Sequence, residues 1–107
     1  MNAPSLGNLE ETILLLMLTV KEEKYGFSVA EAYRQHLNKS ISIPAIHTVL
    51  KRLEKKGLVS SKMGGATAAR GGRKKRLYEV TAYGKQVLVS LRDTRAALWK
   101  AIPPVQL

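Results

Sequence analysis

The chain has 107 residues, 45% of them hydrophobic, and contains no cysteine. This length suits one small domain, with or without an oligomerisation element, and the hydrophobic content excludes a fully disordered chain. Without cysteine there is no disulfide, no thiol nucleophile and no cysteine zinc site, and we expect a cytoplasmic protein. The formal net charge of +10 predicts a polyanionic partner, either nucleic acid or an anionic membrane surface.

The positive charge is concentrated in one part of the sequence. Residues 1–33 have a net charge of −3, whereas residues 39–76 hold eleven Lys and Arg against one acidic residue, Glu54. The longest apolar run, residues 13–18, is far shorter than the roughly 20 residues that cross a bilayer. Two glutamates but no Lys or Arg precede that run, unlike in a signal peptide. We therefore expect no membrane association.

Two helices are predicted in the first part of the chain. Residues 9–22 form the first, because Asn8 and Glu11 match the capping-box pattern and apolar residues repeat at helical spacing. The apolar positions are Leu9, Ile13, Leu14, Leu15, Leu16, Met17, Leu18 and Val20. A helix this apolar is expected to be mostly buried. Residues 29–38 form the second helix, with Ser28 opening another capping box.

A third helix is predicted over residues 43–56. Ser42 occupies the N-cap position, Pro44 fits only a first turn, and Gly57 suits the residue just beyond the C-terminus. The face opposite its apolar stripe contains Ala45, His47, Thr48, Lys51, Arg52 and Lys55. Lys56, at the end of this helix, is also expected to point outward. A face selected only for solubility usually mixes Glu with Lys. The composition therefore favours contact with nucleic acid over a purely solvated surface.

A hairpin and a long helix complete the chain. Residues 58–63 and 76–81 are predicted strands, joined by a loop over residues 64–75 that is rich in Gly, Ala and Arg. Residues 82–101 are predicted to form a helix that ends before Pro103. The three helices and the hairpin already account for a small core. We therefore expect the apolar side of this last helix to pack on a second copy of the chain. The predicted subunit interface contains Leu88, Leu91, Arg95, Leu98, Trp99 and Ile102.

This order of elements predicts a mainly α, α+β fold. Three helices and a two-stranded wing would form a winged helix-turn-helix domain over residues 1–81, and residues 82–107 would form a C-terminal dimerisation helix and tail. In such domains the third helix enters the major groove of DNA, and the wing lies beside it. Segment 70–76 has five basic residues in seven, which suits a wing that contacts phosphates.

Several segments resemble PadR-type transcriptional regulators. They are, in chain order, Leu6-Gly7-Asn8-Leu9-Glu10, Tyr25-Gly26-Phe27-Ser28-Val29, Leu50 to Val59 and Tyr78 to Gly84. The most specific parts are residues 43–59 and 71–81, and the resemblance covers about residues 6–90. It implies a dimeric DNA-binding regulator, usually a repressor, whose C-terminal helix pairs two subunits.

The resemblance also has departures and optional features. PadR-type proteins commonly carry Tyr where this chain has His47, and often Gly or Thr near Pro44 and Ala45, so base readout is expected to differ here. Some small members bind flat aromatic compounds between the subunits through a Trp on the last helix. Trp99 has a similar place, which suggests a small aromatic effector near it. The alternative is that Trp99 belongs to the dimer core.

The predicted DNA contacts come from two helix starts, the third helix and the wing. They are Ser28, Ser42, Pro44, Ala45, His47, Thr48, Lys51, Arg52, Arg70, Arg73, Lys74 and Arg76. The wing residues would hold phosphates, and third-helix residues between Ala45 and Lys51 would read base edges. Ser28 and Ser42 are equally explained as helix caps, a role compatible with a phosphate contact.

The sequence contains no recognisable catalytic constellation. His36 and His47 lie on different predicted helices without a carboxylate cluster, so we expect no metal, no cofactor and no enzymatic activity. We predict a sequence-specific transcriptional repressor that binds an inverted-repeat operator as a homodimer. One alternative is an architectural protein that binds nucleic acid without base discrimination. Another is a winged-helix module that binds protein.

Overall fold

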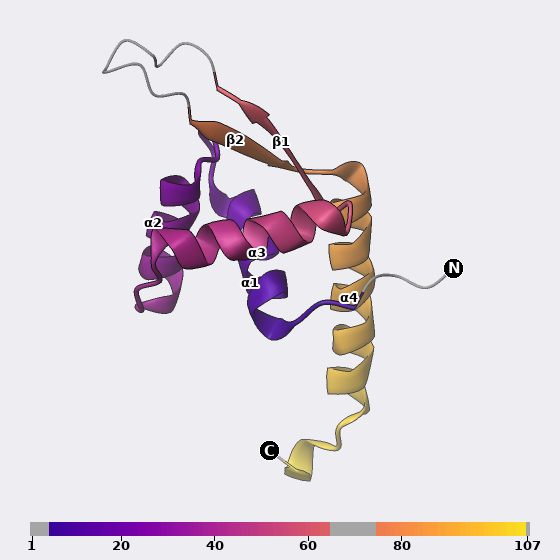
Figure 1. The fold of residues 1–107 in the computed structure, drawn as a ribbon. Coiled ribbons are helices and arrows are strands. Elements are labelled where there is room, and N and C mark those ends of the chain that lie inside the picture. Colours follow the sequence, from indigo (N-terminus) through magenta and orange to yellow (C-terminus); the bar gives the residue numbers. More distant parts are fainter. Residues whose placement is uncertain (1–4, 65–74, 107) are drawn as a thin grey trace.

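The structure is a computed structural model, and it describes residues 5–64 and 75–106. Its elements are α1 (Asn8–Thr19), α2 (Gly26–Leu37), α3 (Ile43–Lys55), β1 (Val59–Met63), β2 (Arg76–Val80), α4 (Ala82–Ala101) and a short 3-10 helix, η2 (Pro104–Gln106). This order confirms the predicted α+β winged-helix fold (Figure 1). None of the helices in these residues is long and apolar enough to span a membrane.

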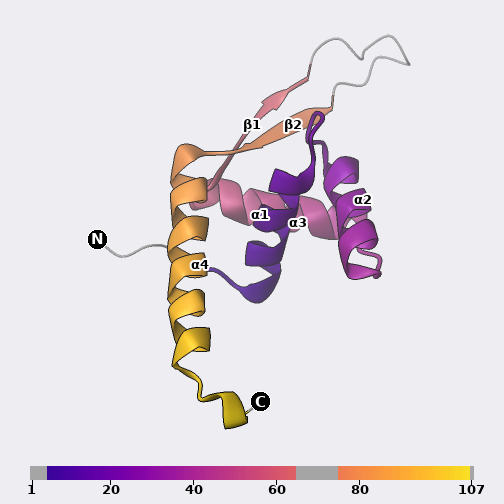
Figure 2. The ribbon, with the colours of Figure 1, turned by 180° about the vertical axis from the view of Figure 1, so that it is seen from behind.

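Helices α1, α2 and α3 enclose the core of the domain. In Figures 1 and 2, α3 lies across α1 and α2, the hairpin projects from the C-terminal end of α3, and α4 stands along one edge. The largest fully buried side chains are Ile13, Leu14, Met17, Val29, Ile46, Leu50, Leu53 and Leu58. They come from all three helices and from the start of the hairpin, so a single apolar core fixes the orientation of α3.

The first two helices begin earlier than predicted. Helix α1 starts at Asn8, and the backbone N–H of Gly7 donates to Oε1 of Glu10 at 2.8 Å. Helix α2 starts at Gly26 because Ser28 lies inside its first turn and accepts a hydrogen bond from the N–H of Tyr25 at 3.3 Å. The predictions of Asn8 and Ser28 as N-caps are therefore wrong, although both helices do begin with a side chain that reaches back to the backbone.

Both ends of α3 agree with the sequence signals. At the N-terminus, Oγ of Ser42 accepts a hydrogen bond from the N–H of Ala45 at 3.2 Å. At the C-terminus, Gly57 has φ +78°, and the N–H of Leu58 donates to the carbonyl of Leu53 at 3.0 Å. This is the six-to-one bond of a Schellman motif, which needs a left-handed residue and so favours glycine. The motif turns the chain directly from α3 into β1.

The hairpin is antiparallel and is tied to the turn between α1 and α2. Its register runs from Val59 opposite Val80 to Met63 opposite Arg76. The N–H of Tyr78 donates to the carbonyl of Lys24 at 2.8 Å, so the turn between α1 and α2 adds a short bridge beside β2. These bonds hold the described part of the wing against the domain.

One face of α1 is more exposed than its composition predicts. Leu15 and Leu18 are 48% and 44% exposed, although they belong to the apolar run that we expected to be mostly buried. They border a groove of about 530 Å³ between α1 and α4, together with Leu88 and Val89. The prediction of a wholly buried first helix is wrong on this side, because α4 contacts α1 without covering it.

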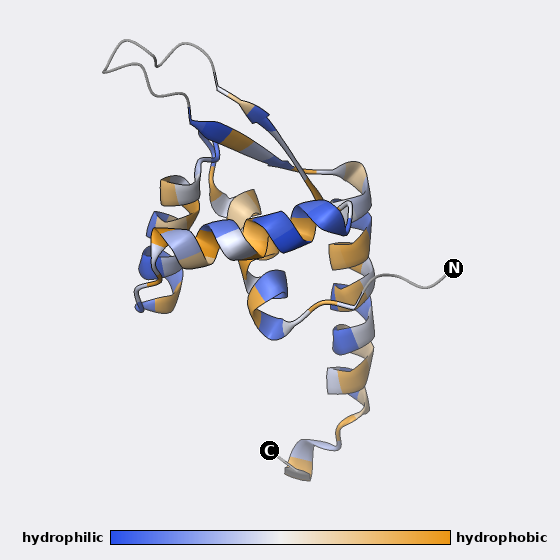
Figure 3. Cartoon of the chain, in the orientation of Figure 1, coloured by the Kyte–Doolittle hydropathy of each residue, from blue (hydrophilic) through white to orange (hydrophobic). Residues whose placement is uncertain are grey.

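Helix α4 packs its apolar side chains against the domain only through its first half. Gly84, Val87 and Leu88 are buried, and Leu91 packs partly against the core. From Arg92 onward every residue of α4 is exposed. Hydrophobic residues nevertheless recur along this helix (Figure 3). The second half of α4 therefore presents apolar side chains that its own chain does not bury.

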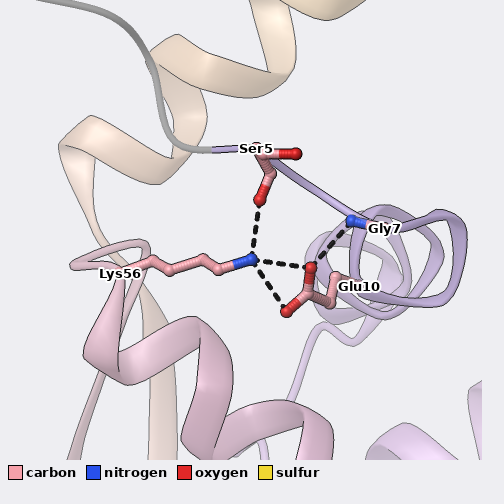
Figure 4. Close-up of polar contacts among 4 residues, drawn as sticks. All are labelled: Ser5, Gly7, Glu10 and Lys56. Atoms are coloured by element: carbon pink, nitrogen blue, oxygen red, sulfur yellow. Dashed lines mark hydrogen bonds and ion pairs between the residues drawn. The ribbon is translucent and has the colours of Figure 1, made fainter.

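A charged side chain joins the start of α1 to the end of α3. The ammonium of Lys56 lies 2.8 and 3.0 Å from the two carboxylate oxygens of Glu10 and donates to the carbonyl of Ser5 at 2.6 Å (Figure 4). Glu10 is 7% exposed. We had expected Lys56 on the outward, DNA-facing side of the third helix, and this expectation is wrong because its partner lies on α1.

Candidate nucleic-acid interface

The exposed face of α3 carries small and basic side chains. Pro44, His47, Thr48 and Lys51 are exposed, and Ala45 is half-buried. The hydroxyl of Thr48 donates to the carbonyl of Pro44 at 3.0 Å, so its hydrogen is used within the helix and its oxygen can still accept a bond. They lie in the first two turns of α3, the part of a recognition helix that approaches base edges, except Lys51, which follows in the third turn.

His47 makes a contact that the sequence did not indicate. Its Nδ1 and the hydroxyl of Tyr78 share a hydrogen bond of 3.2 Å between α3 and β2. On the other side, a Cβ at Gly26 would lie 2.9 Å from Cε1 and Nε2 of His47. The imidazole therefore fills the space between the wing and the start of α2. This contact gives His47 a positioning role in addition to the base contact that we predicted.

A second polar link also joins α3 to the hairpin. Oγ of Ser61, on β1, donates to Oε2 of Glu54 at 2.7 Å, and Nη1 of Arg76 donates to the same Oγ at 3.0 Å. Arg76, a predicted phosphate contact, is thus held at the edge of β2 by a neighbour on β1. Neither Glu54 nor Ser61 was among the predicted site residues, because their pairing depends on how the hairpin folds onto α3.

Tyr78 belongs to the first of these links and lies opposite Ser61, of the second link, in the hairpin. It is 5% exposed, and burial raises the pKa of its phenol, with Arg76 lowering it and Glu54 raising it to smaller extents. The phenol is therefore uncharged at neutral pH. A neutral hydroxyl at this position does not repel an anion, and it stays available for its hydrogen bond with His47.

The structure places the remaining predicted DNA contacts in three different situations. Ser28 donates to the carbonyl of Glu23 at 3.2 Å in addition to accepting from Tyr25, so its hydroxyl serves the turn before α2. Arg52 is exposed on α3. The predicted contacts Arg70, Arg73 and Lys74 lie outside the described residues.

An aromatic pair beside the wing was missed by the sequence analysis. The rings of Tyr25 and Phe27 are stacked with centroids 5.3 Å apart, and Nζ of Lys75 lies 4.7 Å from the centroid of Phe27. Phe27 is 50% exposed. A cation over an aromatic face is a favourable arrangement, and here it joins the start of α2 to the start of β2. The Tyr25-Gly26-Phe27 motif was the only signal in the sequence for this patch.

Some of the predicted interface residues of the last helix contact their own chain in the structure, and others are exposed. Leu88 is buried in the core of the single chain, and Leu91 packs partly against it, which differs from the continuous outer seam that we predicted. Nη2 of Arg95 lies 2.8 Å from Oε1 of Glu11, so this cation is paired within its own chain. Leu98, Trp99 and Ile102 are exposed.

Comparison with known proteins agrees with this architecture. The transcriptional regulator PadR-like family model matches residues 14–90. A protein of Lysinibacillus sphaericus, described as uncharacterized protein X, is 30% identical over 87 residues, which make up 79% of this chain and 75% of that protein.

Two solved structures illustrate the similarity. A PadR-like transcription factor from Bacteroides fragilis matches with a TM-score of 0.72 at 22% identity, over 86% of this chain and 84% of that chain. Bacillus subtilis PadR in complex with operator DNA matches with a TM-score of 0.63 at 25% identity, over 78% of this chain and 46% of that chain. With the family model covering most of the domain, this chain belongs to the PadR-like family of transcriptional regulators.

Proposed function

We propose that this chain is a sequence-specific repressor that binds an inverted-repeat operator as a homodimer. The proposal rests on one surface that joins the exposed face of α3 to the basic end of β2. Lys51 and Arg76 border the same hollow on this surface, beside Thr48 in the second turn of α3. Bacillus subtilis PadR, with a similar fold, is bound to operator DNA in its solved structure.

In the proposed complex, the residues that face base edges differ from the residues that contact phosphates. Pro44, Ala45 and Thr48 face the base edges in the major groove, where small apolar groups suit thymine methyls and the Thr48 oxygen can accept a hydrogen bond. Lysines and arginines of α3 and the wing contact phosphates, which fix the register but do not read the sequence. His47 holds the wing at the angle that lets the base contacts and the phosphate contacts form together.

The dimer is proposed to form through α4, with residues 1–81 as the DNA-binding domain and residues 82–107 as the dimerisation helix and tail. Leu98 and Trp99 are 63% and 64% exposed, and the groove between α1 and α4 has an apolar floor. Covering such surfaces with a second α4 would remove them from water. An aromatic effector near Trp99 is compatible with this exposure and follows from the family resemblance.

Repression would follow from occupancy of the operator. Two copies of α3 related by a two-fold axis meet successive major grooves when half-sites are about one helical turn apart, roughly 34 Å. A dimer in this position covers DNA that the transcription machinery needs.

Footprinting tests the proposal. Wild-type protein should protect one palindromic site in preference to random DNA. Lys51→Glu should weaken that protection, while the matched variant Lys21→Glu, at an exposed position between α1 and α2, should not. Equal affinity for all duplexes would favour the architectural alternative, and unchanged DNA binding by Lys51→Glu would favour a module that binds protein.

A further inference from the structure

A hollow of about 540 Å³ lies between α3 and the hairpin, and we call it the α3–β2 hollow. It is lined by His47, Thr48, Lys51, Glu54, Arg76 and Tyr78. We propose that the α3–β2 hollow seats a single phosphodiester group of the DNA backbone, which Lys51 contacts from α3 and Arg76 contacts from β2. This inference rests on the proposed function and assigns Lys51 to the backbone instead of the base edges.

The charges around the hollow favour an anion. Lys51 and Arg76 are both exposed and come from different elements, so they can approach one group from two sides. Glu54 is the acidic residue of the lining, and Oε2 of its carboxylate accepts the hydrogen bond from Ser61. The buried phenol of Tyr78 is uncharged at neutral pH. A phosphodiester carries one negative charge and accepts two or more hydrogen bonds, which matches two converging cations.

The position of the hollow indicates that its phosphate comes from DNA and not from a free ion. Thr48 borders the hollow and also belongs to the face of α3 that is proposed to enter the major groove. In duplex DNA the phosphates of each strand run along the rim of that groove. A helix placed in the groove by Thr48 therefore brings the rim against the neighbouring hollow.

Arg76 is already oriented in the free protein. Its Nη1 donates to Oγ of Ser61, and Ser61 in turn donates to Glu54. The other guanidinium nitrogens stay available to a phosphate, because an arginine has five N–H donors. Ser61 is therefore a positioning residue for Arg76, and it needs no contact with DNA.

The salt dependence of binding distinguishes one shared phosphate from two separate phosphates. Operator affinity is measured for the full-length wild type, Lys51→Ala, Arg76→Ala and the double variant between about 50 and 200 mM salt. Each phosphate that loses its partner reduces the slope of log K against log salt by about 0.9. Because a homodimer has two such hollows, we expect each single variant to change the slope little and the double variant to reduce it by about 1.8. A reduction of about 3.6 in the double variant, with about 1.8 in each single variant, overturns the proposal.

Neutral linkages in the DNA locate the phosphate. A methylphosphonate removes the charge at one position, and we expect one position in each half-site at which this change abolishes the difference between wild type and the double variant. Lys21→Ala, at an exposed position between α1 and α2, should keep the wild-type response at every position. The proposal fails when no position has this effect, and also when inorganic phosphate alone at the same ionic strength displaces the DNA.

The variant Ser61→Ala tests the positioning role without altering charge. It should weaken operator binding in the wild-type background and have no further effect when Arg76 is already alanine. Equal effects in both backgrounds overturn the role of Ser61. The proposed function can fail separately, because a chain that binds all duplexes equally can still show the shared-phosphate pattern on random DNA. Circular dichroism of each variant confirms that the fold is retained.

Discussion

Single side chains in this domain divide into those that hold the helices together and those that face outward. Lys56 and Lys55 are neighbours in sequence, yet Lys56 pairs with Glu10 on α1 while Lys55 is exposed. The glutamate is 46 positions away in the chain, so helical periodicity on α3 could not identify the pair. Charge alone is therefore a poor guide to which lysines of α3 face outward.

Removing the Lys56 ammonium should destabilise the domain. Lys56→Met leaves the Glu10 carboxylate with its Gly7 N–H bond but without its cation, and hydrogen bonds to charged groups are worth about 1.5–3 kcal/mol. We expect the free energy of unfolding to fall by about that amount in denaturant titrations. The control Lys55→Met should change it by less than about 0.5 kcal/mol. A loss of equal size in both variants contradicts the structural role of Lys56.

The same pair predicts a pH dependence. The hydrogen bond from Lys56 lowers the pKa of Glu10 most, burial opposes this, and the Gly7 N–H lowers it further. Because the folded-state pKa lies below the ordinary value of 4.5, the stabilisation is complete above that value and is lost as the pH falls through the folded-state pKa. The stability gap between wild type and Glu10→Gln should therefore narrow below about pH 4.5. A gap that stays constant down to about pH 2 is inconsistent with this account.

The contact between Gly26 and His47 gives a residue-scale test of the wing's attachment. A Cβ at position 26 would crowd the imidazole, which can rotate away only by breaking its bond to Tyr78. We expect Gly26→Ala to lower the free energy of unfolding by about 1 kcal/mol. The loss should largely disappear in a His47→Ala background, as measured by a double-mutant cycle. Equal losses in the two backgrounds would show that His47 does not fill this space.

At the scale of elements, α3 was predictable and α2 was less so. Ser42, Pro44 and Gly57 mark the ends of α3 through local backbone preferences, which operate without the rest of the fold. The start of α2 was placed too late, because the Tyr25-Gly26 pair reads locally as a turn. Its true boundary depends on Ser28 reaching back to the backbone of Tyr25.

The clearest prediction at the scale of elements concerns dimerisation through helix α4. Leu98 and Trp99 make no use of their own chain's core, so replacing both with Asp should leave the thermal stability of the single chain nearly unchanged. In light scattering at micromolar concentration, the wild type should be a dimer and the double variant a monomer with weaker operator binding. The matched variant Lys100→Ala should remain dimeric. A wild-type monomer under these conditions removes the proposed role of α4.

At the scale of the whole molecule, the sequence indicated the fold and one candidate face for binding DNA. The order of helices and strands follows from local periodicity, and the concentration of charge in residues 39–76 indicated which side faces a polyanion. The links from α3 to the hairpin through Tyr78 and Ser61 were not predictable. They join residues that come together only when the core has formed, and the same holds for the pairing of Arg95 with Glu11.

The central claim is that this face reads a specific inverted repeat. In vitro selection of bound duplexes from a random pool, using the full-length wild-type chain, tests it most directly. We predict enrichment of one inverted repeat whose half-site centres lie about 10 base pairs apart, with loss of enrichment for Lys51→Glu. A selected pool that shows no common motif and no preference over random DNA would contradict the claim.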